Sequence, residues 1–307
     1  MLRKKIKEIF VFLIGISFFS CENVSNDIKL ENTGSHHEII LVINDDIWSE
    51  KTGDILKDIF HEEIQGLPQS ESKFKLIQIN MSEFNRLFRT HKNIIFVDSK
   101  GENSYTKNKW AQDQIVMYLN CSSEKKFREN CQKAFNFIDR KEIESIKSSY
   151  KNGHNKKATE FINEQFGINV YVPTEYSTPI KSNKVFVADF HSFNEKEDII
   201  KYILIFEIPN KKETTTQDII FNTDSILKIY VKGEANNSYV EIDKRTELHT
   251  QSNQIYRGMW SLKNGFMAGP FIMKRYQQEK KNIISIGLVF FPNQEKREFV
   301  RIFEAIL

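Results

Sequence analysis

One cysteine stands where a lipid could be attached. Cys21 follows a 12-residue apolar run, residues 9–20, which is itself preceded by a basic start at residues 3–7. The run fits the apolar core of a secretory signal and is shorter than the ~20 residues of a membrane-spanning helix. Ser20-Cys21 resembles the end of a lipobox, although Phe18 stands where leucine is usual.

Lipid attachment at Cys21 would fix the location of the whole protein. Several acyl chains on one residue anchor a protein stably, whereas a single chain binds a membrane only marginally. We predict a signal peptide over residues 1–20 and a protein exported to the cell envelope. We expect it at the outer membrane, on the periplasmic side, because no charged tract directly follows the cysteine. The alternative is a plain signal anchor with an incidental cysteine.

Carboxylates follow two segments that have the pattern of buried strands. Asp45 and Asp46 come after residues 38–43, and Asp98 comes after residues 93–97. Ligands of open α/β sheets bind beyond the carboxyl ends of the strands, and converging carboxylates suit Ca²⁺ or Mg²⁺. With His91 nearby, these residues suggest a tethered metal-dependent hydrolase. The simpler interpretation is turn chemistry, since Asp bonds its own backbone in turns.

Motifs of established catalytic chemistry do not occur in the chain. The sequence contains no H-E-x-x-H, G-x-S-x-G, Walker or G-x-G-x-x-G pattern, and its seven histidines are scattered. We therefore predict no metal and no cofactor, and a non-enzymatic protein rather than an enzyme. A basic cluster of Arg86, Arg89, His91 and Lys92 could meet a phosphate, a carboxylate or lipid headgroups. Its simpler interpretation is a solvated helix end.

Aromatic residues, Met, Arg and Gly are concentrated in residues 256–271. Arg257, Trp260 and Phe266 are of types that are favoured at binding surfaces, as is Trp48 elsewhere in the chain. Asn264-Gly265 also predicts a tight hairpin turn. The segment is therefore either a binding surface or a hairpin whose aromatic side chains belong to the core.

Charge argues against nucleic acid as a partner. The full chain has 44 basic and 41 acidic residues, and removal of residues 1–20 leaves 40 of each. The exported part is formally neutral, whereas nucleic-acid binding rests on a basic surface.

The hydrophobic pattern predicts an α+β fold with sheets covered by amphipathic helices. Residues 21–37 are polar and predict a flexible tether. An α/β half over 38–150 and a strand-rich half over 160–307 follow, with a polar joint at 145–159. Because both halves end in a strand followed by an amphipathic helix, they could be two similar, duplicated units; such units are also common. Strands are predicted at 38–43, 74–79, 93–97, 114–119, 184–190, 199–208, 238–242, 254–260, 266–276 and 283–291. Helices are predicted around residues 55–60, after Ser82 and Ser123, at 216–230 and at the end.

The two remaining cysteines are predicted to be free. Cys121 ends a strand, and Cys131 lies about two turns into the following helix, on the order of 10 Å away. A disulfide requires Cα atoms within about 7 Å. We expect two buried free thiols, and a disulfide between them is the alternative.

Two segments together resemble a known family. Residues 37–98, with "NDDIWSEKTGD" and "GLPQS", and residues 257–271, "RGMWSLKNGFMAGPF", are similar to domain of unknown function 4837, a family of Bacteroidota envelope lipoproteins. The resemblance extends over nearly all of the mature chain. It implies no established activity and no catalytic residue. The matching residues include Asp45, Asp46, Trp48, His91, Arg257 and Trp260.

These observations favour a membrane-anchored binding or scaffold protein over an enzyme. The expected partners are the membrane, through the lipid anchor, and a protein or glycan of the envelope. The residues we single out for binding are Asp45, Asp46, Trp48, His91, Asp98, Arg257, Trp260 and Phe266.

Overall fold

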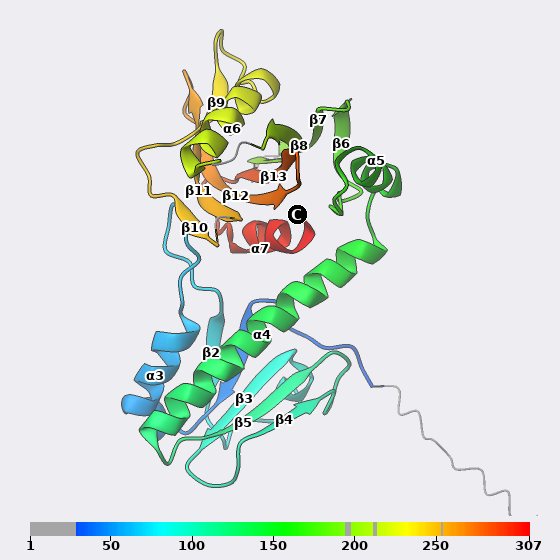
Figure 1. Ribbon diagram of the computed structural model, residues 1–307. Coiled ribbons are helices and arrows are strands. Elements are labelled where there is room, and N and C mark those ends of the chain that lie inside the picture. The colour runs from blue at the N-terminus through cyan, green and yellow to red at the C-terminus, as the bar shows by residue number, and fades with distance from the viewer. Residues whose placement is uncertain (1–28, 194–197, 211–213, 253) are drawn as a thin grey trace, which may run out of the picture.

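Two β-sheets follow one another along the chain, and one long helix lies between them (Figure 1). The computed structural model describes residues 29–193, 198–210, 214–252 and 254–307. Cys21 and the predicted signal peptide lie outside these residues. In the described part of the chain, no helix is both long and apolar enough to cross a membrane. The mixture of helices with two sheets confirms the predicted α+β class.

The first sheet is mainly parallel, with the strand order β2-β1-β3-β5-β4. Only β4, at one edge, runs antiparallel to its neighbour. A parallel arrangement brings the amino ends of neighbouring strands to one edge of the sheet and the carboxyl ends to the other. The bounds are Glu38–Val42 for β1, Lys75–Ile79 for β2, Asn93–Asp98 for β3, Ser104–Lys107 for β4 and Ile115–Asn120 for β5.

Both faces of the first sheet are covered, as the near-continuous apolar strands predict. Ile39 and Leu41 of β1 pack in a core with α3 (Lys51–Phe60) and α4 (Glu124–Asn152). Alternate residues of the same strands face the other way and pack against Phe84, Phe88 and Trp110 from the connecting segments. The strands therefore position α4 across one face of the sheet (Figure 1).

The prediction of a short helix after Ser82 is wrong. That segment forms turns and the single 3₁₀ turn η1 (Phe88–Thr90). The side chains of Asn80 and Asn85 accept hydrogen bonds from the backbone N–H groups of Ser82 and Leu87. Asn side chains that satisfy local backbone donors in this way stabilise turns at the expense of helix.

The second sheet is antiparallel, with the order β10-β11-β12-β13-β8-β7-β6 and with β9 paired to β11. Its central strand, β13, is buried along almost its whole length. The bounds are Ser177–Lys181 for β6, Val185–Phe193 for β7, Asp198–Pro209 for β8, Tyr239–Ile242 for β9, His249–Gln251 for β10, Ile255–Lys263 for β11, Ala268–Gln277 for β12 and Lys281–Phe290 for β13.

Helices cover both faces of the second sheet. α5 (Lys156–Phe166) and α7 (Arg297–Ile306) share a core with one face. α6 (Thr216–Tyr230) packs on the other, and it begins at a capping box formed by Thr215 and Asp218. α7 lies between the second sheet and α4, so it carries the contact between the halves (Figure 1).

The joint predicted at residues 145–159 is mostly helical. α4 continues to Asn152, and after a three-residue break α5 begins at Lys156. Asn155 starts α5, because its side chain accepts the backbone N–H of Ala158 at 3.1 Å. Gly167 ends it with a φ of 68°, a left-handed conformation that favours glycine.

The described part of the predicted tether, residues 29–37, lies against the first sheet. Leu30 forms a backbone bridge to Ala111, and Thr33 forms one to His91. The backbone N–H of Thr33 donates to the carbonyl of Thr90 at 2.8 Å. This stretch brings His36 and His37 to the junction of the two halves.

The halves are not two similar units. Each ends in a strand and an amphipathic helix, but the first sheet is mainly parallel and the second is antiparallel. The likeness of the sequences around α4 and α7 reflects a shared local pattern, an apolar stripe at helical spacing. The possibility of two duplicated halves is therefore contradicted by the sheet topology.

Candidate functional site

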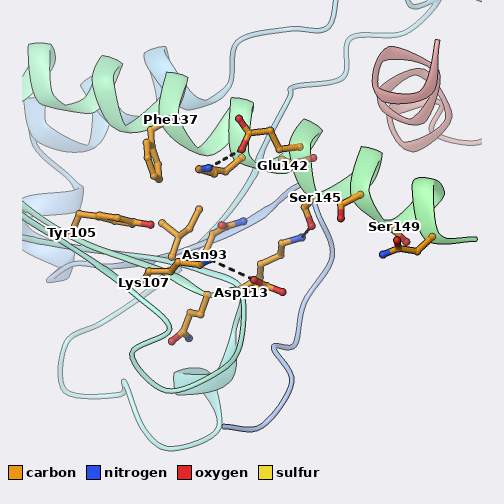
Figure 2. Close-up of a pocket in the computed structure, with 15 residues that line it drawn as sticks. Asn93, Tyr105, Lys107, Asp113, Phe137, Glu142, Ser145 and Ser149 are labelled. Carbon is orange, nitrogen blue, oxygen red and sulfur yellow. Dashed lines mark hydrogen bonds and ion pairs between the residues drawn. The ribbon is translucent and has the colours of Figure 1, made fainter. Parts of the chain in front are cut away.

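A cleft of about 660 Å³ lies between α4 and one edge of the first sheet. Its floor is built from the amino ends of β3 and β5 and from β4, and its opposite wall is the cleft side of α4 (Figure 2). The side chains on the sheet side include Lys92, Asn93, Tyr105, Lys107, Asp113 and Gln114. Those on α4 include Phe137, Lys141, Glu142, Glu144, Ser145, Ser148, Ser149 and Asn152.

Two aromatic rings form the apolar part of this cleft. Tyr105 of β4 and Phe137 of α4 have ring centroids 4.9 Å apart at an interplanar angle of 65°, an edge-to-face pair. Tyr105 is exposed and Phe137 is half-buried. Figure 2 shows the two rings at the same end of the cleft. A ligand entering there would meet the aromatic surface that the two packed rings form together.

The remaining rim is polar and carries paired charges. Lys141 donates to Glu144 at 2.7 Å, and Lys107 lies 3.9 Å from Asp113. Both pairs are largely exposed, so each contributes little to stability. Ser148, Ser149 and Asn152 add hydroxyl and amide groups along α4.

A buried lysine lies at the inner end of the cleft. Lys92 is only 8% exposed, and its Nζ lies 2.6 Å from Nδ1 of His36 and 3.3 Å from Oγ of Ser145. Burial, followed by the neighbouring Lys92, lowers the pKa of His36 to about 4, so at neutral pH its Nδ1 accepts the hydrogen bond. Burial also lowers the pKa of Lys92, although the charges of Glu142 and Asp113 oppose this.

Glu142 separates this cleft from a smaller one. It is 3% exposed and lines both the larger cleft and a cavity of about 180 Å³ at the junction with α7. Its Oε1 lies 3.8 Å from Nε of Arg301, and its Oε2 has no hydrogen-bond partner in the described residues. Burial raises its pKa to about 8, against the opposing charges of Arg301 and Lys92. Burial therefore favours the protonated form of this carboxyl group.

The chemistry of the cleft favours binding over acyl transfer. A serine beside a lysine of lowered pKa is the pair used by some hydrolases. Such a reaction also needs N–H donors aimed at the developing oxyanion. Ser145 lies in the interior of α4, where the backbone N–H groups are consumed by the helix itself. Its hydroxyl and the amine of Lys92 are positioned to hold a polar group.

The predicted carboxylate site does not form. Asp98 ends β3, at the edge opposite the cleft, and His91 precedes the same strand. The residues from 91 to 98 span about 20 Å in an extended strand. No group of three or more His, Cys, Asp or Glu residues in the described ranges could hold a metal ion. Without that convergence, the hydrolase hypothesis has no support in the described residues.

Local roles account for the acidic residues instead. Asp45 and Asp46 form the first turn of α2 (Asp45–Trp48), and Asp45 accepts a hydrogen bond from Gln78 at 2.8 Å. Asp98 accepts the backbone N–H of Lys100 at 3.3 Å, within a turn. The Asp98 contact matches the interpretation as turn chemistry, whereas Asp45 bonds to a side chain of β2.

His91 and Trp48 also have structural surroundings. His91 is buried, its Nδ1 lies 3.2 Å from the carbonyl of Asn93, and its Nε2 lies 3.6 Å from Glu38. Gly34 packs so closely on its ring that a Cβ there would lie 2.3 Å from Nε2. Trp48 is half-buried beside the first core, with Nζ of Lys57 4.7 Å from its ring.

The segment 256–271 is the predicted hairpin, and most of it is core. β11 ends at Lys263 and β12 begins at Ala268, with Asn264 at a φ of 55° in the turn. Trp260 is only 3% exposed and packs in the second sheet's core, so its assignment to a binding surface is wrong. Strand alternation places its side chain inward.

Arg257 and Phe266, the other two residues predicted to bind in this segment, differ in their surroundings. Arg257 of β11 pairs with Glu304 of α7 at 2.8 Å, within the second half, so its side chain is already bound. Phe266 is 92% exposed at the hairpin turn, beside a cavity of about 480 Å³ between residues 241–245 and 261–268. A binding role for Phe266 stays a prediction.

Cys121 and Cys131 are free, as predicted. Cys121 is half-buried and Cys131 is fully buried. Burial raises the pKa of the Cys131 thiol to about 12, which makes it unreactive at neutral pH.

Residues that the sequence interpretation missed make up most of the cleft. Of the predicted basic cluster, Lys92 reaches the inner cleft, whereas Arg89 lies over Trp110, with its guanidinium carbon 5.9 Å from the ring centroid. Nothing in the sequence around Tyr105 or Phe137 indicates a cleft. Glu142 could have been noticed in the sequence, because it is a charged residue in the apolar stripe of α4 between Ile138 and Ile146, four residues from each.

Comparison with known families divides the chain at the end of α4. Residues 155–307 match the family described as "Domain of unknown function (DUF4837)", and this part of the chain therefore belongs to it, as the resemblance predicted. The match does not extend over the first half. Residues 32–151 match a separate family, "Domain of unknown function (DUF8532)". No curated protein matches the chain.

Proposed function

We propose that this chain, which joins domains of two families of unknown function, is a lipid-anchored envelope protein that binds a glycan in the cleft along α4. The observation that carries the binding proposal is the composition of that cleft. It combines an aromatic pair at one end with hydroxyl, amide and charged groups along the rest. The proposal assigns no catalytic step.

A sugar ring fits this combination of groups. Its C–H faces are apolar and pack on aromatic side chains, whereas its hydroxyl rim needs hydrogen-bond donors and acceptors. Tyr105 and Phe137 supply the aromatic surface. Ser148, Ser149 and Asn152 supply polar groups on the opposite stretch of the same cleft. The volume of about 660 Å³ is of the size that small-ligand sites occupy.

The anchor proposal rests on the sequence around Cys21. The described chain begins at Lys29, beside the first sheet. Residues 22–28 span at most about 25 Å when fully extended. A lipid on Cys21 would therefore keep the first sheet and its cleft close to the membrane surface.

The anchor can be tested by the change Cys21→Ala in the full chain. We expect loss of labelling by radioactive palmitate and release of the protein from the membrane fraction. Cys121→Ala is the matched control, since the second cysteine should not be acylated. Membrane association of Cys21→Ala equal to that of the wild type would refute the anchor.

Glycan binding can be tested with the polysaccharide pool extracted from the envelope of the producing cells. We expect the full chain to bind this pool in isothermal titration and Tyr105→Ala to weaken binding at least tenfold. Phe221→Ala, which removes an exposed ring of α6, should bind like the wild type. Equal affinities of all three proteins, or binding of a protein partner in place of the glycan, would contradict the proposal.

A further inference from the structure

Lys92 differs from the other lysines of the cleft in how its charge is balanced. Lys107 and Lys141 each have a carboxylate partner, Asp113 at 3.9 Å and Glu144 at 2.7 Å. The contacts of Lys92 are an imidazole nitrogen and a hydroxyl, both neutral at pH 7. Lys92 forms no ion pair with any carboxylate in the described residues, although it is far more buried than the other two.

A buried ammonium group without a counter-ion is costly, and proteins usually pair such groups. An ammonium group has three N–H donors, and His36 and Ser145 account for two of them. Lys92 also lines the cleft. The remaining donor, on an ammonium group that contacts no carboxylate in the described residues, defines a place where an anionic group would be held.

We infer that Lys92 and Ser145 bind a carboxylate or phosphate group carried by the glycan. This inference rests on the proposed function, because it specifies the chemical class of the ligand in the same cleft. The Ser145 hydroxyl would donate to one oxygen of the anion while the Lys92 ammonium donates to another. Charge-assisted hydrogen bonds of this kind are about twice as strong as neutral ones.

The groups that surround Lys92 make the binding depend on pH. It is faced by His36 from the amino-terminal segment, by Ser145 and Glu142 from α4, and by Asp113 from the loop before β5. Glu142, with its pKa raised to about 8, becomes negative as the pH rises past that value and then competes with the ligand for Lys92. Because burial lowers the pKa of Lys92, that group also loses charge earlier than an exposed lysine. Both effects weaken anion binding at alkaline pH.

The test compares three forms of the same envelope polysaccharide pool. One is untreated, one has its carboxyl groups reduced to alcohols, and one has been dephosphorylated with hydrofluoric acid. Isothermal titration with the full chain at pH 6.5 should give at least tenfold weaker binding for the form that has lost the recognised anion. Which form weakens identifies the group as a carboxylate or a phosphate.

Two variants assign the effect to the inner cleft. Lys92→Met should bind all three forms with the same weakened affinity. Ser145→Asp supplies an internal carboxylate beside Lys92 and should do the same, so a misfolded Lys92→Met protein would not decide the question. Lys133→Met, at an exposed position of α4 that does not line the cleft, should retain the preference for the untreated pool.

The outcomes separate this inference from the proposed function. Equal binding of all three pools by the wild type, sensitive to Tyr105→Ala, would overturn the anion inference and leave glycan binding in place. Failure of every pool to bind would overturn both. Preference for the untreated pool in Lys92→Met and Ser145→Asp as strong as in the wild type would place the anion elsewhere.

Discussion

Two buried cations face α4, one from each half of the molecule, and they are balanced in different ways. Arg301 of α7 lies 2.5 Å from Asp139, 3.0 Å from Glu304 and 3.8 Å from Glu142. Lys92, at the start of β3, contacts only a neutral imidazole and a hydroxyl. The first cation is paired with carboxylates from both halves and serves to join them. The second leaves charge available, and it lies in the open cleft.

Sheet topology explains why the two cations differ. The parallel first sheet gathers the amino ends of β3 and β5 at one edge, and α4 crosses above it to form the cleft. The antiparallel second sheet is closed on that side by α7, whose apolar face fills the core and whose Arg301 turns toward α4. The same helix therefore serves as a cleft wall in one half and as an interface in the other.

The largest expected effect comes from removing the paired cation. Arg301→Met leaves Asp139, Glu142 and Glu304 without their shared partner. Breaking a buried charge network in this way costs about 3–5 kcal/mol of the free energy of unfolding, measurable by urea denaturation. Arg140→Met, which removes an exposed partner of Glu144, is the control and should cost less than about 1 kcal/mol. Equal losses of unfolding free energy in both variants would mean that the buried ion pairs of Arg301 stabilise the protein no more than an exposed pair does.

Trp260→Ala should cost about 3 kcal/mol, because it opens a cavity in the core of the second sheet. The loss lies at the low end for such a change, since the buried indole N–H has no hydrogen-bond partner in the described residues. Phe266→Ala, in the same hairpin but 92% exposed, should change stability by less than about 0.5 kcal/mol. A stable Trp260→Ala protein would mean that the hairpin is not core.

Glu142→Gln should change the pH dependence of stability. In the unfolded chain Glu142 ionises near 4.5, whereas folding raises its pKa to about 8. Between these values the folded state binds more protons, so the wild type loses up to about 1.4 kcal/mol per pH unit as the pH rises from 5 to 8. The Gln side chain cannot ionise, so its stability curve should be flatter over that range. Urea unfolding at pH 5, 6, 7 and 8 measures this, and parallel curves for the two proteins would show that Glu142 is not protonated in the folded state.

Lys92→Met should have the smallest effect, within about 1 kcal/mol of the wild type in urea denaturation. The change removes two hydrogen bonds but also removes a buried charge that lacks a counter-ion. The comparison with Arg301→Met is the sharpest test of the two roles. A loss above about 3 kcal/mol would make Lys92 a structural residue like Arg301.

Much of the fold could be predicted from local patterns. Helix α6 occupies the predicted residues 216–230, and most long strands lie within a few residues of their predicted bounds. Helix α5 was missed because its amphipathic pattern begins inside a polar stretch, although Asn155 and Gly167 are strong start and end signals. The long-range arrangement of parallel and antiparallel strands had no comparable local signal.

The cleft could be predicted only in part. Lys92 was recognised as a residue that could meet a carboxylate or phosphate, but its partner His36 lies 56 positions earlier, in a stretch expected to be a tether. The carboxylate hypothesis placed the site at the wrong edge of the first sheet. Strand-end residues there, such as Asp98, form hydrogen bonds within turns. Which edge is open depends on where α4 crosses, and that is decided by packing.

Hydrogen exchange of the full chain, with and without the envelope polysaccharide pool, tests the central claim most directly. Amide protection reports locally on segments that a ligand covers or orders. We expect slower exchange in β4, in residues 89–93 and in the carboxy-terminal turns of α4, with no change at the hairpin turn, residues 263–268. Protection at the hairpin turn with none along α4 would contradict the account, because it would place binding in the half that we assign to structure.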